Sequence, residues 1–234
     1  MRIIGNRGNT ARKVQAVASG ALASGDTVVV NANGTVSVVA GGSQSIGSET
    51  NFETGGRVEH LSAAYDANAQ KVVIAYRDNT NSNYGTAIVG TVSGTSITFG
   101  TAVVYHADAT NYSSIVYDEN AQKVVIAYQD DNDSNKGTAI VGTVSGTGIS
   151  FGSPTVFDTD NAFINTVYDA NAQKIVISYR DGGNSDYGTA IVGTVSGTNI
   201  SFGSPTVFAA SNTFINDIVY DSTAQKVVVA YRNY

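Results

Sequence analysis

Residues 117–130 read YDENAQKVVIAYQD, the clearest copy of a tract that recurs along the chain. Near-copies read YDANAQKVVIAYRD at 65–78, YDANAQKIVISYRD at 168–181 and YDSTAQKVVVAYRN at 220–233. A second tract, GTAIVGTVSGT, is identical at 85–95, 137–147 and 188–198. Self-similarity at a fixed period of about 51 residues marks a repeat architecture, in which each unit buries its apolar surface against its neighbours.

Each repeat predicts four antiparallel strands, and the second repeat shows them most clearly. The first strand, 114–117, ends in the Tyr-Asp pair and leads through a short turn to the second, 123–128. That second strand is a continuous apolar run, which is typical of a strand covered on both faces of its sheet. The third strand, 138–144, and a half-exposed outer strand, 149–156, are joined by a turn with Gly146 where a hairpin needs positive φ.

The composition also indicates an all-β protein. Leucine occurs only twice among 234 residues and proline twice, whereas β-branched valine is abundant. Four antiparallel strands in about 51 residues match a blade, so we expect a β-propeller of four-stranded blades. Two alternatives remain open: another sheet assembly built from repeated hairpins, and a solenoid, which uses parallel coils without tight hairpins.

The repeats predict a domain organisation. A basic arm and β-hairpin anchor module occupies 1–40, a Gly/Ser-rich linker 41–57 and the repeats 58–234, divided into 58–109, 110–160, 161–211 and the half repeat 212–234. The valine-rich strand 227–231 would leave a bare sheet edge, which invites pairing. Its partner would be the hairpin 27–39, a second copy of the chain or further repeats. We favour a second copy, because the linker separates the hairpin 27–39 from the repeats and so makes it part of the N-terminal module.

Charge separates the two ends of the chain. Arg2, Arg7, Arg12 and Lys13 form a candidate docking arm, whereas the other 221 residues carry 9 basic and 19 acidic side chains, net −10. That balance argues against nucleic acid as a partner, because its binding needs a cationic surface. No apolar run approaches the 18 residues of a membrane span, so we expect no membrane insertion.

Catalysis and cofactors are not expected. The absence of cysteine excludes disulfides, thiolate metal sites and a cysteine nucleophile. The two histidines, His60 and His106, do not occupy equivalent repeat positions, and no nucleophile elbow or phosphate-binding loop occurs. We therefore predict no enzyme, no cofactor and no catalytic residue.

One end of the repeats differs between copies, whereas the other is nearly identical. The polar loops 78–84, 130–136 and 181–187, with the connections 105–112, 157–162 and 208–213, share the variable end. This concentration of differences favours an end that faces a partner, although loops also tolerate change without any such role.

The candidate ligand face lies at this variable end. It comprises Arg77, Asp78, Asn81, Tyr84, Tyr105, Tyr112, Gln129, Asp130, Arg180, Asp181, Tyr187 and Arg232. Residues 77, 129, 180 and 232 are equivalent and would point towards the top of a central channel. There the arginines would bind an acidic sugar through bidentate hydrogen bonds, or pair with the adjacent aspartates or the neighbouring blade. The tyrosines suit stacking on a sugar, or are ordinary rim residues.

A calcium site is a weaker hypothesis for one loop. Asp130, Asn132 and Asp133 supply closely spaced oxygens, and calcium takes six to eight oxygen ligands. An EF-type loop would also need glycine and glutamate where this chain has Asn135 and Val141. Asx turns explain the loop without metal, so we predict no metal site.

The repeated tracts resemble repeats in structural proteins of tailed bacteriophages, especially phages of marine bacteria. Residues 23–39 (ASGDTVVVNANGTVSVV) are similar to small β modules that anchor phage fibres or decoration proteins. The resemblance implies a homo-oligomeric appendage on the virion surface, a fibre or a capsid or tail decoration. Its N-terminus would dock on a capsid or tail protein, and its repeats would contact a host-surface glycan. A free carbohydrate-binding lectin is the alternative, and a glycoside-processing propeller enzyme the third hypothesis.

Overall fold

The computed structural model describes residues 17, 18, 20–22, 28–33, 35–38 and 46–233, and it divides the chain into two compact units, Met1–Ile46 and Gly47–Tyr234. The smaller unit contains an antiparallel hairpin of β1 (Val28–Val30) and β2 (Val36–Val38). The side chain of Asn33 stabilises its turn by accepting hydrogen bonds from the backbone N–H and hydroxyl of Thr35. The predicted docking-arm residues, Arg2, Arg7, Arg12 and Lys13, lie outside the described residues.

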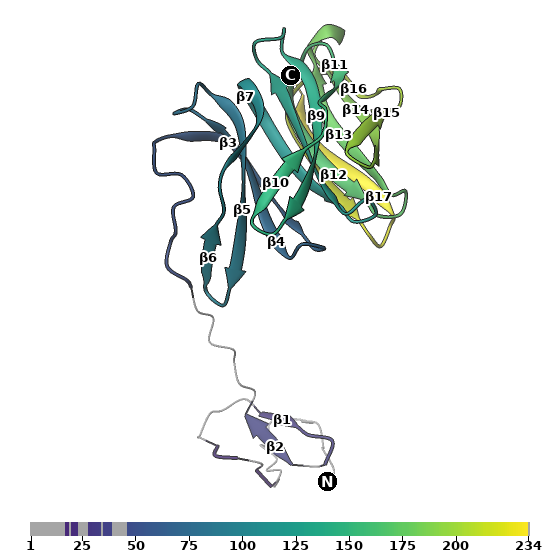
Figure 1. The fold of residues 1–234 in the computed structure, drawn as a ribbon. Coiled ribbons are helices and arrows are strands. Elements are labelled where there is room, and N and C mark those ends of the chain that lie inside the picture. Colours follow the sequence, from purple (N-terminus) through teal and green to yellow (C-terminus); the bar gives the residue numbers. More distant parts are fainter. Residues whose placement is uncertain (1–16, 19, 23–27, 34, 39–45, 234) are drawn as a thin grey trace. The chain divides into compact units, whose positions relative to one another are not determined.

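The larger unit is built from β-strands, as its composition predicts (Figure 1). Its strands are β3 (Val58–Asp66), β4 (Lys71–Asp78), β5 (Tyr84–Ser93), β6 (Ser96–Phe99), β7 (Val103–Asp118), β8 (Lys123–Asp130), β9 (Lys136–Ser145), β10 (Gly148–Phe151), β11 (Thr155–Asp158), β12 (Asn161–Asp169), β13 (Lys174–Asp181), β14 (Tyr187–Ser196), β15 (Asn199–Phe202), β16 (Thr206–Asp221) and β17 (Lys226–Asn233). The only helical element in the described part is a 3₁₀ turn, Gly182–Asn184, so no described helix could cross a membrane.

Two long strands, β7 and β16, join successive repeats. The first part of β7 pairs with β5 up to Ala109, and its second part pairs with β8 from Thr110. β16 changes partner from β14 to β17 between Asn212 and Thr213. The expected connections at 105–112 and 208–213 are continuous strand, because β7 and β16 run on from the outer edge of one repeat to the first strand of the next.

These partner changes define four repeats. Repeat 1 contains β3–β6 and β7 to Ala109, and repeat 2 contains β7 from Thr110 and β8–β11. Repeat 3 contains β12–β15 and β16 to Asn212, and repeat 4 contains the rest of β16 and β17. All pairing within the repeats is antiparallel and uses tight hairpins, which excludes the solenoid alternative.

The repeats stack face to face, with repeat 2 between repeats 1 and 3. Val124, Ile126 and Tyr128 of β8 pack in a core cluster shared with repeat 1. Val125 and Ala127, which alternate with them, pack in a second cluster shared with repeat 3. Both sets of side chains are buried. Since successive side chains of a strand point to opposite faces, the prediction that this apolar run is covered on both faces is confirmed.

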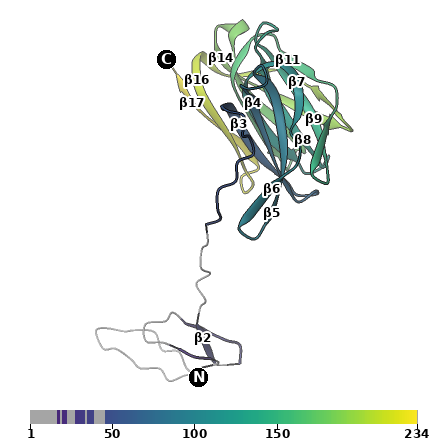
Figure 2. The same ribbon diagram turned by 60° about the vertical axis from the view of Figure 1, so that its left-hand side comes forward.

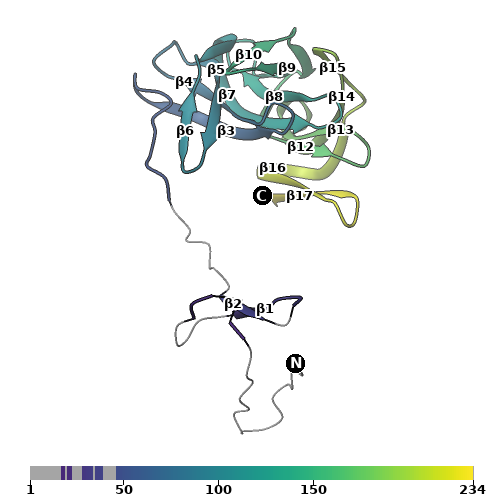
Figure 3. The ribbon, with the colours of Figure 1, turned by 60° about the horizontal axis from the view of Figure 1, so that its bottom comes forward.

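The first strands of neighbouring repeats also lie side by side (Figure 3). The backbone N–H of Ile115 donates to Ser62 Oγ at 3.2 Å, between repeats 1 and 2. The backbone N–H of Thr166 likewise donates to Ser114 Oγ at 3.1 Å, between repeats 2 and 3. The stack is therefore held by regular polar contacts as well as by the two apolar clusters.

The hairpin at the end of each third strand rests on the repeat before it. Its glycine has a left-handed φ, as at Gly146 (+60°), where the sequence predicts positive φ. The neighbouring threonine carbonyl then lies so close to a glycine of the preceding repeat that a Cβ there would overlap it. Thr147 meets Gly100 in this way, and Thr198 meets Gly152.

Residues 47–54 pack beside repeat 1 without forming a strand. Their sequence, GSETNFET, matches GSPTVFDT at 152–159, which includes the outer strand β11. The Phe52 ring packs on Tyr76 and Phe99 with centroids 5.2 and 5.8 Å apart. Residues 47–57 of the expected linker therefore belong to the larger unit, because the division from the smaller unit falls after Ile46.

Candidate functional site

The variable loops lie beside the junctions between repeats, at what we call the loop end. The backbone N–H of Thr110, the first residue of repeat 2, donates to the carbonyl of Asn83 in a repeat 1 loop at 3.2 Å. Thr213 makes the same contact with Asp186, at 2.9 Å, between repeats 3 and 4. Loops and junctions thus meet at one end, and the near-identical turns lie at the other.

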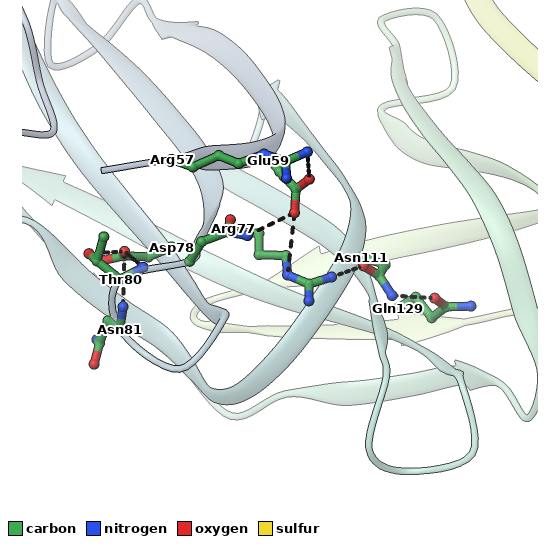
Figure 4. A network of polar contacts seen from close by, with 9 residues as sticks. Arg57, Glu59, Arg77, Asp78, Thr80, Asn81, Asn111 and Gln129 are labelled. Carbon is green, nitrogen blue, oxygen red and sulfur yellow. Dashed lines mark hydrogen bonds and ion pairs between the residues drawn. The ribbon is translucent and has the colours of Figure 1, made fainter. Parts of the chain in front are cut away.

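Carboxylates at the ends of the second strands shape these loops. Asp78 Oδ1 accepts hydrogen bonds from the backbone N–H groups of Thr80 and Asn81 at 2.9 and 3.1 Å, and from the Thr80 hydroxyl at 2.7 Å (Figure 4). Two residues of the same loop, Ser82 and Asn83, have left-handed φ values. Asp78 is therefore occupied as an Asx-turn acceptor and is buried.

A chain of polar contacts links the repeats at the loop end (Figure 4). Arg77 of repeat 1 donates through Nη1 to Asn111 Oδ1 of repeat 2. Asn111 Nδ2 donates to Gln129 Oε1 at 3.2 Å, and Gln129 Nε2 donates to the carbonyl of Asn161 in repeat 3. The next-to-last residue of each of these second strands thus contacts the next repeat, which was one of the alternatives for these positions.

An acidic side chain completes this chain beside Arg77. Glu59 Oε2 lies 4.0 Å from Arg77 Nε and accepts a hydrogen bond from Asn79 Nδ2 at 2.9 Å. The bond from Asn79 is the main cause that lowers the pKa of Glu59; burial opposes it, and Arg57 and Arg77 add to it. Glu59 is therefore an anion at neutral pH that holds Arg77 in place.

A row of aromatic rings crosses the repeats beside these polar groups. Ring centroids lie 5.3 Å apart between His60 and Tyr112, 5.0 Å between Tyr112 and Phe163, and 5.9 Å between Phe163 and Phe214. The Arg180 guanidinium lies over both Phe163 and Phe214, 5.1 Å from each centroid. These four half-buried rings and Arg180 form what we call the aromatic row, in which π faces and a cation lie together.

Backbone strain helps to position the aromatic row. His60, Tyr112 and Phe163 have φ values of +48°, +49° and +53°, each at an irregularity in the first strand of its repeat. A bulky residue with such a φ value costs about 1–3 kcal/mol, and this strained conformation persists only where the surrounding structure imposes it.

Burial, followed by the charge of Arg77, lowers the pKa of His60, so its ring is neutral at pH 7.

A second variable position lies where the outer strand approaches the end of the second strand. In repeat 2, His106 Nδ1 lies 3.2 Å from the Tyr128 hydroxyl, and His106 Nε2 lies 3.1 Å from Asp130 Oδ2. In repeat 3, Asp158 replaces the histidine near Asp181, and burial, followed by that neighbouring charge, raises the pKa of Asp158 to about 6. The same scaffold thus places a histidine beside an aspartate in one repeat and two aspartates together in the next.

The other predicted ligand residues lie in different surroundings. Tyr105 is buried in the core, where its hydroxyl contacts Ser113 Oγ at 2.8 Å and burial raises its pKa to about 12. Tyr84 and Tyr187 are half-buried at the loop end, where β5 and β14 begin. The exposed residues are Asn81, in a loop, and Arg232, near the end of β17.

The residues of the weak calcium hypothesis have protein partners. Asp133 pairs with Lys136 at 2.8 Å, Asn132 donates to Asp108, and Asp130 pairs with His106. Among the described residues, no three acidic or histidine side chains are grouped so that they could hold a metal ion.

The sequence interpretation missed three members of the aromatic row: His60, Phe163 and Phe214. A signal for two of them was present, because His60 and Phe163 precede the tyrosine of their Tyr-Asp pair by five residues, as Tyr112 does. Phe214 could not be found in this way, since it lies one position earlier in its repeat.

No model of a known protein family matches the chain, and no curated protein matches it.

Proposed function

We propose that the chain is a non-enzymatic structural protein of a tailed-phage particle, a fibre or a capsid or tail decoration, located on the virion surface. Its N-terminal unit docks on a capsid or tail protein, and its loop end contacts a host-surface glycan. The observation that carries the proposal is the loop end itself. There, loops of varied chemistry and the aromatic row stand on a scaffold that hardly changes between repeats.

We further propose that the repeats are blades arranged around an axis, as in a β-propeller. The side-by-side first strands support this arrangement, since the first strand of each blade is the innermost one. The polar chain from Arg77 through Gln129 would then surround the loop end of that axis. An experimental structure tests this: first strands around one axis would support the blades, and a straight row of sheets would contradict them.

The chemistry of the loop end suits sugars. Aromatic rings offer apolar faces on which a sugar ring stacks, while amides and arginines bond its hydroxyl or carboxylate groups. The aromatic row supplies the rings, and Arg180, whose side chain is 24% exposed, supplies a cation between two of them. An acidic glycan is the ligand class that uses both features.

A glycan array tests the binding half of the proposal. We expect Asn81→Ala, Tyr84→Ala and Tyr187→Ala at the loop end to weaken binding of an acidic glycan by about tenfold or more, as hot-spot residues do. Matched controls at the opposite end are Asn68→Ala, Glu119→Ala and Asn199→Ala, which should leave binding unchanged. Equal effects at both ends, or no binding to any glycan, would contradict the proposal.

Incorporation into particles tests the docking half. In a phage that encodes the chain, deletion of residues 1–40 should abolish its incorporation into purified virions. Undiminished incorporation would contradict the anchor. Glycan binding by a chain that is never found in particles would instead favour the free lectin.

A further inference from the structure

The interface between successive repeats is built from one set of contacts that recurs along the stack. At the turn after each first strand, a backbone N–H donates to the tyrosine hydroxyl of the next repeat. The donors are Asn68, Asn120 and Asn171, and the acceptors are Tyr117, Tyr168 and Tyr220, each at 3.2 Å. Each repeat therefore has a back face that carries the turn and a front face that carries the tyrosine.

Apolar packing follows the same rule. On the back face of repeat 2, Val125 and Ala127 pack against Ile175 and Ile177 on the front face of repeat 3, and all four are fully buried. An inner back face and an inner front face thus bury each other's central apolar side chains.

The front face of repeat 1 is only partly covered. Its tyrosine, Tyr65, is 57% exposed, whereas the equivalent Tyr117 and Tyr168 are half-buried. Val72 and Ile74 are also only half-buried. They occupy the positions of Ile175 and Ile177, whose side chains are fully buried.

The back face of repeat 4, which would match the front face of repeat 1, is also largely uncovered. Its strands, β16 and β17, lie at the edge of the larger unit (Figure 2). Val219 is 60% exposed and Val228 50% exposed, although Val125, at the position of Val228, is fully buried. These side chains line a shallow hollow with Asp217, Ile218 and Ala230. The hollow is therefore the back half of an inter-repeat interface.

We propose that a second copy of this chain docks head to tail, with the back face of repeat 4 on the front face of repeat 1. Val228 and Ala230 then meet Val72 and Ile74, as Val125 and Ala127 meet Ile175 and Ile177. The hydroxyl of Tyr65 accepts from the turn at Thr223, whose position matches that of Asn171. The occupant is a second copy because this chain carries both halves of an interface that it already forms three times.

The contact joins two different surfaces and is therefore heterologous, so it builds rings or filaments rather than closed two-fold dimers. Within one chain both faces are solvent-exposed together, so neither covers the other. The inference does not depend on the appendage function, since it follows from the repeat interface alone.

Two charged variants of the full chain test the proposal by sedimentation velocity. The front variant carries Ala63→Glu and Tyr65→Glu, and the back variant carries Val219→Glu and Val228→Glu; all four positions are exposed in the single chain. We expect the unmodified chain to associate as its concentration rises, and each variant alone to associate at least about tenfold more weakly.

Mixing the two variants gives the most specific result. Each retains one intact face, so a 1:1 mixture should form a heterodimer and no larger species. Val156→Glu is the matched control, because Val156 is as exposed as Val228 (50%) but lies on the outer strand β11, away from both faces. It should associate like the unmodified chain.

Three outcomes would overturn the proposal. An unmodified chain that stays monomeric at every concentration would do so. A front variant that still associates while the back variant does not would indicate pairing of β17 with β17. A control as impaired as the variants would show that added charge alone is responsible.

Discussion

Strands β8 and β17 have nearly the same sequence but opposite surroundings. β8 reads KVVIAYQD and β17 reads KVVVAYRN, and both form eight-residue antiparallel strands. All six central residues of β8 are buried, whereas β17 is half-buried or exposed throughout. Tyr128 is fully buried and the equivalent Tyr231 is 43% exposed. The comparison teaches that a continuous apolar run predicts a strand that can be covered on both faces, while its neighbours decide whether it is.

The largest expected effect concerns the central isoleucine of β8. Ile126→Ala should lower the free energy of unfolding by about 2–5 kcal/mol, because the side chain is fully buried and leaves a cavity. The equivalent Val229→Ala in β17 should cost clearly less, since Val229 is only half-buried. Urea unfolding of both variants measures the difference. A loss below about 0.5 kcal/mol for Ile126→Ala would mean that β8 is not covered as described.

A second pair of variants tests the seating of hairpins on preceding repeats. Gly152→Ala should destabilise by about 1–3 kcal/mol, because its Cβ would overlap the carbonyl of Thr198 and force a shift. Gly203 is the matched position one repeat later, and a Cβ there meets only the Val192 oxygen at 3.9 Å. Gly203→Ala should therefore be close to neutral in thermal unfolding. Equal costs at the two glycines would contradict the packing of hairpin on glycine.

Substitutions at the equivalent positions Asp158 of repeat 3 and His106 of repeat 2 should have different effects on stability. Burial raises the pKa of Asp158 in the folded state to about 6, above its ordinary value of 3.8. The folded state therefore binds this proton more tightly, and stability is lost as pH rises from about 4 through 6. Asp158→Asn should remove that loss and stabilise the protein by about 1 kcal/mol at pH 8, after allowance for solvent screening, with no gain at pH 4.

The matched change in repeat 2 is His106→Asn, which removes the contact with Asp130. It should give no stabilisation at pH 8. Unfolding curves between pH 4 and 8 check both variants, and a gain at pH 8 from His106→Asn but not from Asp158→Asn would reverse the assignment of the two pairs.

The smallest effect concerns the tyrosine hydroxyls. Tyr117→Phe should cost about 0.5–1.5 kcal/mol, because the backbone N–H of Asn68 loses its acceptor in repeat 2. Tyr65→Phe at the equivalent exposed position should be within about 0.5 kcal/mol of neutral in a dilute sample. Chemical unfolding at low concentration compares them. Equal losses would mean that Tyr65 already has a partner within the chain.

The loop end was predictable in position but not in its contacts. Alternating connections placed the variable loops and the junctions together, and the repeat alignment placed Arg77, Gln129 and Arg180 at equivalent sites. Their partners could not be predicted, because each reaches into the next repeat, where the facing residue differs: Asn111 for Arg77 and Phe214 for Arg180. Tyr105 was expected on the candidate ligand face, in the connection 105–112, yet β7 runs on through it and buries its ring.

The repeat period, the all-β class, the hairpin glycines and the end at which variation gathers could be inferred from the amino-acid sequence, because they follow from local alternation, turn chemistry and self-similarity. Tertiary packing alone showed which of four near-identical strands is buried, that residues 47–54 pack beside repeat 1, and that 105–112 continues as one strand. The physical reason is that strand formation depends on local backbone preference, whereas burial and register depend on which neighbours cover a face. Near-identical copies carry no information that distinguishes their places in a stack.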